Sequence, residues 1–162
     1  MELTNLDDLE KRNVDAGTDI LKEGEAGSDI YVLSSGEVSV SKSGKELCRV
    51  NDQSVFGEIS SFLKQPYSAT VRAETDCEFY IITDVEAYLE ANPKSALYFT
   101  EVLAKRLVNM NNHFVEIKAE IEELKHSSQG NEKVQSKISL LLSKMDSFWG
   151  TEVFPEDLEE DD

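Results

Sequence analysis

The residues with the clearest chemical potential lie between Phe56 and Ala73, in the stretch FGEISSFLKQPYSATVRA. A Gly-Glu pair opens a short apolar turn, Lys-Gln-Pro ends it, and SATVRA has the pattern of a strand. A strand, a tight turn, one helical turn and a second strand would direct backbone N–H groups and one carboxylate, that of Glu58, into a pocket. The role of the tyrosine at position 67 is the question that this stretch raises.

The elements around this stretch are predicted to be β-strands. Short β-branched runs at 20–21, 30–50, 54–58 and 68–83 are separated by glycines and turns. The plainest hairpin is VSVSKSGKELCRV, in which Ser43-Gly44 supplies the turn. Closely spaced short strands of this kind favour a β-sandwich, a jelly roll or a small barrel.

A helical period replaces the strand pattern from Asp84 onwards. VEAYLEAN forms a helix that stops before Pro93, and a longer helical pattern runs from about Pro93 to Lys125. Its apolar residues are spaced alternately by four and three, which is the heptad pattern of a coiled coil. This heptad seam comprises Leu103, Leu107, Met110, Phe114, Ile117, Ile121 and Leu124. We expect it to form the interface of a parallel homodimer, although packing of the helix on its own sheet is an alternative.

The same spacing resumes after a break at 127–131, from Val134 to Phe148. This second helix could fold back on the first or extend it, and the sequence does not decide between the two. The tail after Trp149 is acidic, and we expect it to be mobile, with a short docking motif for a protein partner as an alternative role.

Composition excludes several classes of protein. The formal net charge is −17, with no basic cluster, so we expect no binding of nucleic acid or of anionic membrane. No apolar run is long enough for a membrane helix, and the N-terminus does not resemble a signal peptide. Cys48 and Cys77 are too few for a disulfide framework, which makes the cytoplasm the expected compartment.

Catalysis and metal binding are not expected. Both histidines, His113 and His126, lie on or at the end of the long predicted helix, and no Ser-His-Asp or Cys-His pattern falls in a pocket. The two cysteines cannot hold an iron–sulfur cluster, which needs about four ligands. We therefore predict that the protein is not an enzyme.

Three segments resemble a cyclic-nucleotide-binding domain of the catabolite-activator and protein-kinase regulatory-subunit family. They are ILKEGEAGSDIYVLSSGEVSV at 20–40, the stretch at 56–73, and the long helix. The second resembles the family's phosphate-binding cassette, whose pattern is F-G-E-(L/I), an apolar turn and P-R-(A/S)-A-(T/S)-V. The resemblance implies a mainly β protein with some α: a jelly roll (double-stranded β-helix), a long C-terminal dimerisation helix and a second, shorter helix.

The resemblance also suggests how the chain is organised. It gives a β-roll with flanking short helices at 1–91, the heptad helix at 92–126, the second helix at 131–148 and the acidic tail at 149–162. Activators of the family carry a winged helix-turn-helix after the long helix. Here 36 residues follow His126 and they are acidic, so we expect no DNA-binding domain.

The family comparison implies a role for each residue of the cassette. Gly57 would let backbone approach a phosphate, and Glu58 would accept a hydrogen bond from a ribose 2′-hydroxyl. N–H groups at the start of the helical turn, together with Ser68, would contact the cyclic phosphate. The implied ligand is cyclic AMP or cyclic GMP, and the implied ligand-binding set is Gly57, Glu58, Ile59, Ser60, Tyr67, Ser68 and Ala69.

Tyr67 departs from the pattern, because the family has an arginine at this place that binds two phosphate oxygens at once. Loss of such a charged partner costs about 2–5 kcal/mol, or roughly 30- to 3,000-fold in affinity. Two cations could compensate: Lys64, in the loop before Pro66, and Arg72, which strand alternation places on the opposite face from Tyr67.

Two functions follow from these observations. In the first, a regulatory domain senses a cyclic nucleotide or related small ligand and signals through its C-terminal helices. In the second, the domain binds no nucleotide and serves as a dimeric scaffold or interaction module, with Tyr67 filling the pocket. The intact cassette favours the first function, which is the one that we predict, and Tyr67 favours the second, which is the alternative.

Overall fold

The computed structural model describes residues 3–51, 54–127 and 131–147. They fall into two compact units, Met1–Val102 and Leu103–Asp162. The first unit contains all eight strands of the described chain, and the second contains the C-terminal part of the long helix and the helix that follows it. The predicted acidic tail lies outside the described residues.

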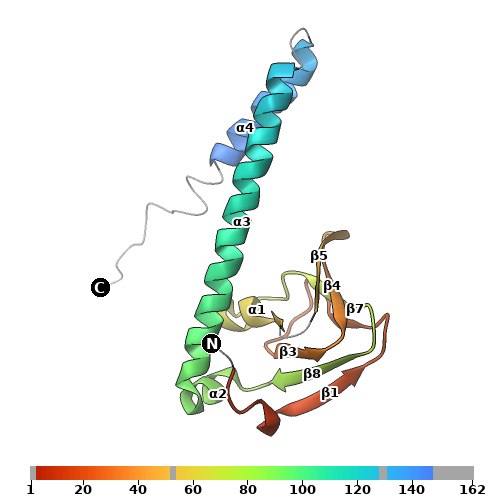
Figure 1. Ribbon diagram of the computed structural model, residues 1–162, viewed down its shortest axis with the longest axis vertical. Helices are drawn as coiled ribbons and strands as arrows, with labels where there is room; N and C mark the ends of the chain where they lie inside the picture. The colour runs from red at the N-terminus through yellow and green to blue at the C-terminus, as the bar shows by residue number, and fades with distance from the viewer. Residues whose placement is uncertain (1–2, 52–53, 128–130, 148–162) are drawn as a thin grey trace, which may run out of the picture. The chain divides into compact units, whose positions relative to one another are not determined.

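The first unit is a sandwich of two four-stranded antiparallel sheets (Figure 1). One sheet has the order β1-β8-β3-β6 and the other β2-β7-β4-β5. The strands are β1 (Glu10–Val14), β2 (Asp19–Leu21), β3 (Ile30–Ser35), β4 (Glu37–Lys42), β5 (Lys45–Asn51), β6 (Val55–Phe56), β7 (Thr70–Ala73) and β8 (Cys77–Ile82). This arrangement confirms the predicted jelly-roll class.

The helices also lie where the sequence pattern predicts them. A short 3₁₀ turn, Leu6–Asp8, precedes β1, and α1 (Glu58–Leu63) lies between β6 and β7. After β8 come α2 (Val85–Ala91), α3 (Pro93–Ser127) and α4 (Glu132–Ser147). Among the described residues α4 is the element after α3, and they contain no winged helix-turn-helix.

The predicted hairpin is formed by β4 and β5, with Lys42 opposite Lys45. Ser43 and Gly44 have φ values of 50° and 73°, so both central residues of the turn are left-handed. That is the geometry of a two-residue turn whose twist matches the flanking strands. The serine-glycine pair therefore fixes the register of the hairpin.

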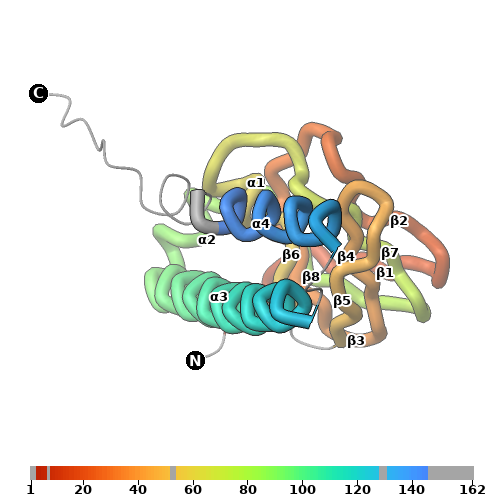
Figure 2. The backbone as a smooth tube through the Cα atoms, turned by 90° about the horizontal axis from the view of Figure 1, so that it is seen from above, coloured from red at the N-terminus to blue at the C-terminus, as the bar shows by residue number. Residues whose placement is uncertain are grey.

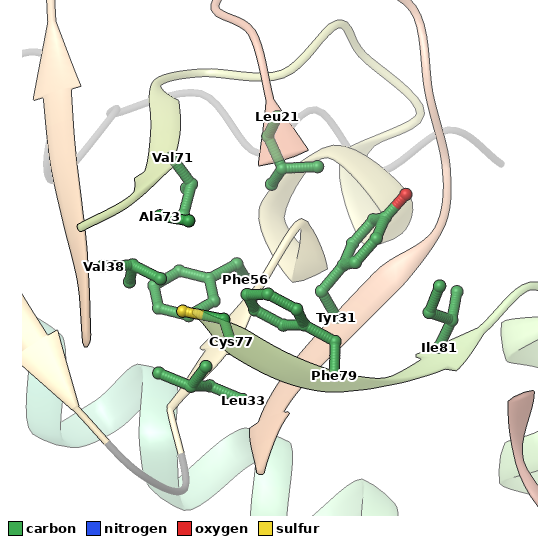
Figure 3. Packing of buried hydrophobic residues seen from close by; sticks show 10 residues of the cluster. All are labelled: Leu21, Tyr31, Leu33, Val38, Phe56, Val71, Ala73, Cys77, Phe79 and Ile81. Atoms are coloured by element: carbon green, nitrogen blue, oxygen red, sulfur yellow. The ribbon is translucent and has the colours of Figure 1, made fainter. Parts of the chain in front are cut away.

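Two apolar clusters hold the first unit together. One lies between the sheets, where the rings of Tyr31, Phe56 and Phe79 gather with aliphatic side chains (Figure 3). The other covers the opposite face of the β1-β8-β3-β6 sheet and includes Ile30, Val32, Ile82, Tyr88 and Phe99. Successive β3 side chains enter opposite clusters because side chains alternate along a strand.

A buried polar network ties the N-terminal segment to the junction between α2 and α3. Asn92, 8% exposed, donates to the carbonyl of Tyr88 at 2.9 Å and accepts from the Asn5 amide at 2.6 Å. The Thr4 hydroxyl donates to the same amide oxygen at 3.2 Å, and the Tyr88 hydroxyl donates to the Thr4 carbonyl at 2.7 Å. The Asn92 side chain thus joins the N-terminal segment to the end of α2, just before Pro93.

The second unit is a helical hairpin, in which α4 runs back along the C-terminal part of α3 (Figures 1 and 2). Along residues 104–127 of α3, the side chains that are not exposed are Asn111, Phe114, Lys118 and Ile121. Along α4, from 132 to 145, they are Gln135, Ile138, Leu142 and Met145. Each set follows a three-four-three spacing on one face, so the two sets form the contact between the helices. Of the two directions left open by the sequence, α4 folds back.

No helix among the residues that the structure describes is long and apolar enough to cross a membrane.

Replacement of Asn92 by alanine should lower the free energy of unfolding by about 1–3 kcal/mol, because buried donors from Asn5 and Thr4 lose their acceptor. Chemical denaturation of the full chain measures this loss. Asn109→Ala, at an exposed position of α3, is the control and should change stability by less than about 0.5 kcal/mol. Equal effects of the two changes would contradict the structural role of the network.

Candidate nucleotide-binding site

The cassette between β6 and β7 has the predicted backbone. Gly57 precedes α1 with a φ of 88°, and a Cβ atom there would collide with the carbonyl oxygen of Asp29. Only glycine combines a positive φ with the absence of a Cβ atom, so only glycine fits this position without strain. Glu58, the first residue of α1, is 2% exposed. The start of the cassette therefore lies close against the loop that precedes β3.

The loop that ends the cassette is closed by its own hydrogen bonds. The hydroxyl of Ser60 donates to the carbonyl of Pro66 at 3.2 Å, and the N–H of Gln65 donates to the carbonyl of Ser60 at 3.1 Å. Lys64 takes a left-handed conformation, with a φ of 52°, at the end of α1. The Ser60 hydroxyl is thus already engaged inside the protein.

Tyr67 lies inside the site, half-buried against the core cluster between the sheets. Its N–H donates to the carbonyl of Glu25 at 2.9 Å, and its carbonyl accepts from the N–H of Gly24 at 2.8 Å. These two bonds hold the residue against the loop after β2. Its ring reaches Gly27, where a Cβ atom would collide with the phenol, and passes 3.6 Å from the Cβ position of Gly57.

The electrostatic surroundings of Tyr67 favour a neutral hydroxyl. Burial, followed by the nearby Tyr31 and Asp29, raises the pKa of Tyr67 to about 12, although a hydrogen bond from the Asp29 backbone acts in the other direction. Burial also raises the pKa of Tyr31 above its ordinary value. Tyr67 therefore stays uncharged near neutral pH, and the carboxylate of Asp29 adds negative charge near it.

The two cations that the sequence offers as substitutes for the missing arginine are engaged elsewhere. Arg72 is exposed on β7 between the buried Val71 and Ala73, and it pairs with Asp19 at 3.3 Å. Tyr67 lies before β7, which begins at Thr70, so alternation along the strand does not relate the two residues. Lys64 is exposed and lies 3.7 Å from the carboxylate of Glu86. Neither side chain meets Tyr67 in the structure.

Sequence reasoning missed three residues around Tyr67. Gly27 has an ordinary φ, so it is not required by a turn; its importance comes from its contact with the phenol. Asp29 contributes its backbone and its charge. Arg12, on β1, pairs with Glu10 at 2.8 Å, and its charge acts on Tyr31, the neighbour of Tyr67, where it lowers the pKa against the larger effect of burial. The glycine in EAGSD was a visible signal, but its partner could not be read from spacing.

An open cleft of about 930 Å³ lies beside the cassette. It is lined by the loop at 26–28, by the α1 side chains of Ser60, Ser61 and Phe62, and by the start of α2. Glu58 and Tyr67 do not line it. The cleft therefore shares Ser60 with the ligand-binding set that the resemblance implies, but it does not include Glu58 or Tyr67.

The remaining predicted positions have less direct roles. Ile59 is 37% exposed on α1, and Ser68 and Ala69 are half-buried in the segment that leads into β7. Cys48 is exposed on β5 and Cys77 is buried on β8, both as free thiols. In the described part of the chain, no group of three or more His, Cys, Asp or Glu side chains could hold a metal ion.

Comparison with known proteins identifies the family. Residues 11–89 match the family model "Cyclic nucleotide-binding domain". A cGMP-dependent protein kinase of Toxoplasma gondii is 42% identical over 62 residues, which are 38% of this chain and 6% of the kinase. The potassium/sodium hyperpolarization-activated cyclic nucleotide-gated channel 2 of Mus musculus is 33% identical over 93 residues, which are 56% of this chain and 11% of the channel.

A solved structure shares the fold. The catabolite activator protein of Thermus thermophilus has a TM-score of 0.63 at 20% identity, with 91% of this chain and 81% of that chain covered. Residues 11–89 therefore belong to the cyclic-nucleotide-binding-domain family, as the cassette predicted. The chain spans a small fraction of the length of the kinase and of the channel.

If Tyr67 packs on Gly27 in solution, Gly27→Ala should destabilise the wild-type protein but have little effect in a Tyr67→Ala background. A double-mutant cycle by chemical denaturation should give a coupling energy of about 0.5–3 kcal/mol. The control pair, Ser28→Ala with Tyr67→Ala, changes an exposed neighbour and should be additive. Additivity for Gly27 as well would refute the contact.

Proposed function

We propose that this chain is a non-enzymatic regulatory domain of the cyclic-nucleotide-binding fold in which Tyr67 takes the place of the nucleotide. It acts in the cytoplasm as a dimeric protein-interaction module. The observation that supports this most directly is the packing of the Tyr67 ring on Gly27 and beside Gly57, within the cassette itself. Kinase and channel relatives whose names specify cGMP dependence and cyclic-nucleotide gating support a regulatory role.

The charges around the cassette support the loss of nucleotide. A cyclic phosphate is an anion, and its burial needs a cation or several donors to replace its water. The cassette instead holds the buried Glu58, with Asp29 beside Tyr67, and both candidate cations pair with other carboxylates. Without an arginine at position 67, a phosphate in the cassette would lack a two-pronged cationic partner at that place, which weakens its binding.

A ligand-sensing domain is the second candidate, and the backbone of the cassette favours it. Gly57 keeps the left-handed conformation and the close approach to Asp29, as a working cassette requires. In that case the ligand must first displace the Tyr67 ring. The affinity is then reduced by the fraction of molecules in which the ring has moved away.

The proposed module assembles as a homodimer through its long helix. Because the seam residues Phe114 and Ile121 face α4, the proposed interface is the part of the predicted heptad seam that they leave open. The aromatic and acidic segment at 149–162 is proposed to bind a protein partner. Neither nucleic acid nor membrane is expected as a partner, because the chain carries a formal net charge of −17.

Thermal unfolding with millimolar cyclic AMP and with millimolar cyclic GMP separates the two candidates. The Tm of the wild-type protein should not change when nucleotide is added. Tyr67→Arg restores the charge and removes the phenol, so its Tm should rise by roughly 5–10 °C if ligand reaches about 100 times its Kd. Tyr67→Ala is the matched control, because it opens the space without adding a cation, and it should shift less than Tyr67→Arg.

A ligand-dependent rise in the wild type would contradict the proposed loss of nucleotide and would establish the sensor. A rise in Tyr67→Ala equal to that in Tyr67→Arg would mean that the phenol blocks the site and that the missing charge matters little. No rise in any variant would leave the domain without nucleotide, but it would show that Tyr67 is not the cause.

A further inference from the structure

The predicted heptad seam of α3 divides into two halves in the structure. One half, Phe114 and Ile121, lies on the inner face that packs against α4, and Leu107, seven residues before Phe114 on the same face, is 47% exposed. The other half lies three residues further along at each step and remains open: Met110, Ile117 and Leu124 are 54%, 51% and 58% exposed. The fold-back of α4 therefore covers only part of the apolar surface of α3.

The second helix adds to the open half. Leu141 lies three residues after the inner-face residue Ile138, and Val134 lies four residues before it; they are 50% and 39% exposed. A step of three residues turns a helix by about 300°, so each open side chain is offset by about 60° from the inner face, in the same sense on both helices. Because the helices run antiparallel, both sets lie on one side of the hairpin.

We infer that this open face, defined as Met110, Ile117, Leu124, Val134 and Leu141, binds the same face of a second copy of the chain to form a four-helix bundle. The inference rests on the proposed homodimer and replaces a two-helix seam by a surface to which α4 contributes. A face that is two helices wide with apolar side chains from both matches the packing of such bundles.

The levels of the side chains favour a second copy as the occupant. α3 ends at Ser127 and α4 begins at Glu132, and the two helices run antiparallel, so residues about equally far from these two ends lie at about the same height. Ile117 lies ten residues before the end of α3 and Leu141 lies nine residues after the start of α4. Leu124 lies three residues before that end and Val134 lies two residues after that start. A two-fold axis parallel to the helices would place Ile117 against Leu141 of the second copy, in one layer, and Leu124 against Val134 in the next. An isologous interface needs this self-complementarity.

The charges at the edges of the open face agree with that arrangement. The α3 edge carries the exposed Glu120, and the α4 edge carries the exposed Lys137 and Lys144. The same two-fold axis brings the α3 edge of one copy onto the α4 edge of the other. Glu120, seven residues before the end of α3, and Lys137, five residues after the start of α4, then lie within about one helical turn of each other in height. Opposite charges then meet in a chain whose net charge would otherwise drive the copies apart.

Analytical ultracentrifugation of the full chain tests the inference. Wild type should sediment as a dimer at micromolar concentration. Ile117→Asp and Leu141→Asp should each raise the dimer Kd by more than about 100-fold, because an unpaired carboxylate would be buried in the bundle. The matched controls are Val115→Asp and Leu140→Asp, at positions 63% and 58% exposed that lie off the open face, and they should remain dimers. Circular dichroism should show unchanged helix content throughout.

Charge exchange gives a second readout that is independent of the apolar residues. Glu120→Lys and Lys137→Glu should each weaken self-association, and an equimolar mixture of the two variants should form a heterodimer tighter than either homodimer. If Leu141→Asp stays dimeric while Ile117→Asp becomes monomeric, the inference is overturned and the two-helix seam stands. A wild type that is monomeric at every concentration would instead overturn the proposed homodimer itself.

Discussion

The packing of one phenol ring against a glycine determines what the rest of the first unit can do. Tyr67 is anchored by backbone bonds to Gly24 and Glu25, and its ring lies on Gly27 beside the start of the cassette. The β-sandwich and α1 form the frame of the cassette, and the Tyr67 ring lies within that frame. In the function proposed above, this side chain takes the place of a ligand, and its neutral hydroxyl avoids the cost of burying a charge without a partner.

The polar groups next to the cassette have partners of their own. The Ser60 hydroxyl donates to the carbonyl of Pro66, Arg72 pairs with Asp19, and Lys64 pairs with Glu86. Exposed ion pairs of this kind add little stability, so these two pairs do not hold the fold. If the site has lost its ligand, the surface left for function is the helical hairpin. The packing of α4 on α3 leaves apolar side chains of both helices exposed on one face of that hairpin.

The sequence was sufficient for the architecture and insufficient for two details of the sites. Serine and glycine at the β4–β5 turn, Gly-Glu before α1 and proline after α2 each have a local steric reason, so the elements could be placed by reading the chain. The contact of Tyr67 with Gly27 joins residues 40 positions apart and leaves no periodic signal. The sequence did not determine the direction of α4, because the interruption of the heptad pattern at 127–131 is compatible with a fold-back or an extension. Which half of the α3 seam stays exposed depends on that direction.

The most direct test of the central claim is to follow the backbone amides of Gly27, Gly57 and Ser68 by nuclear magnetic resonance while cyclic AMP is added to the full-length protein. If Tyr67 occupies the site, these amides should keep their chemical shifts up to millimolar nucleotide, because the phosphate cannot reach them. Saturable shifts of these three amides would show that the nucleotide displaces the Tyr67 ring, and they would contradict the claim that this side chain has replaced the ligand.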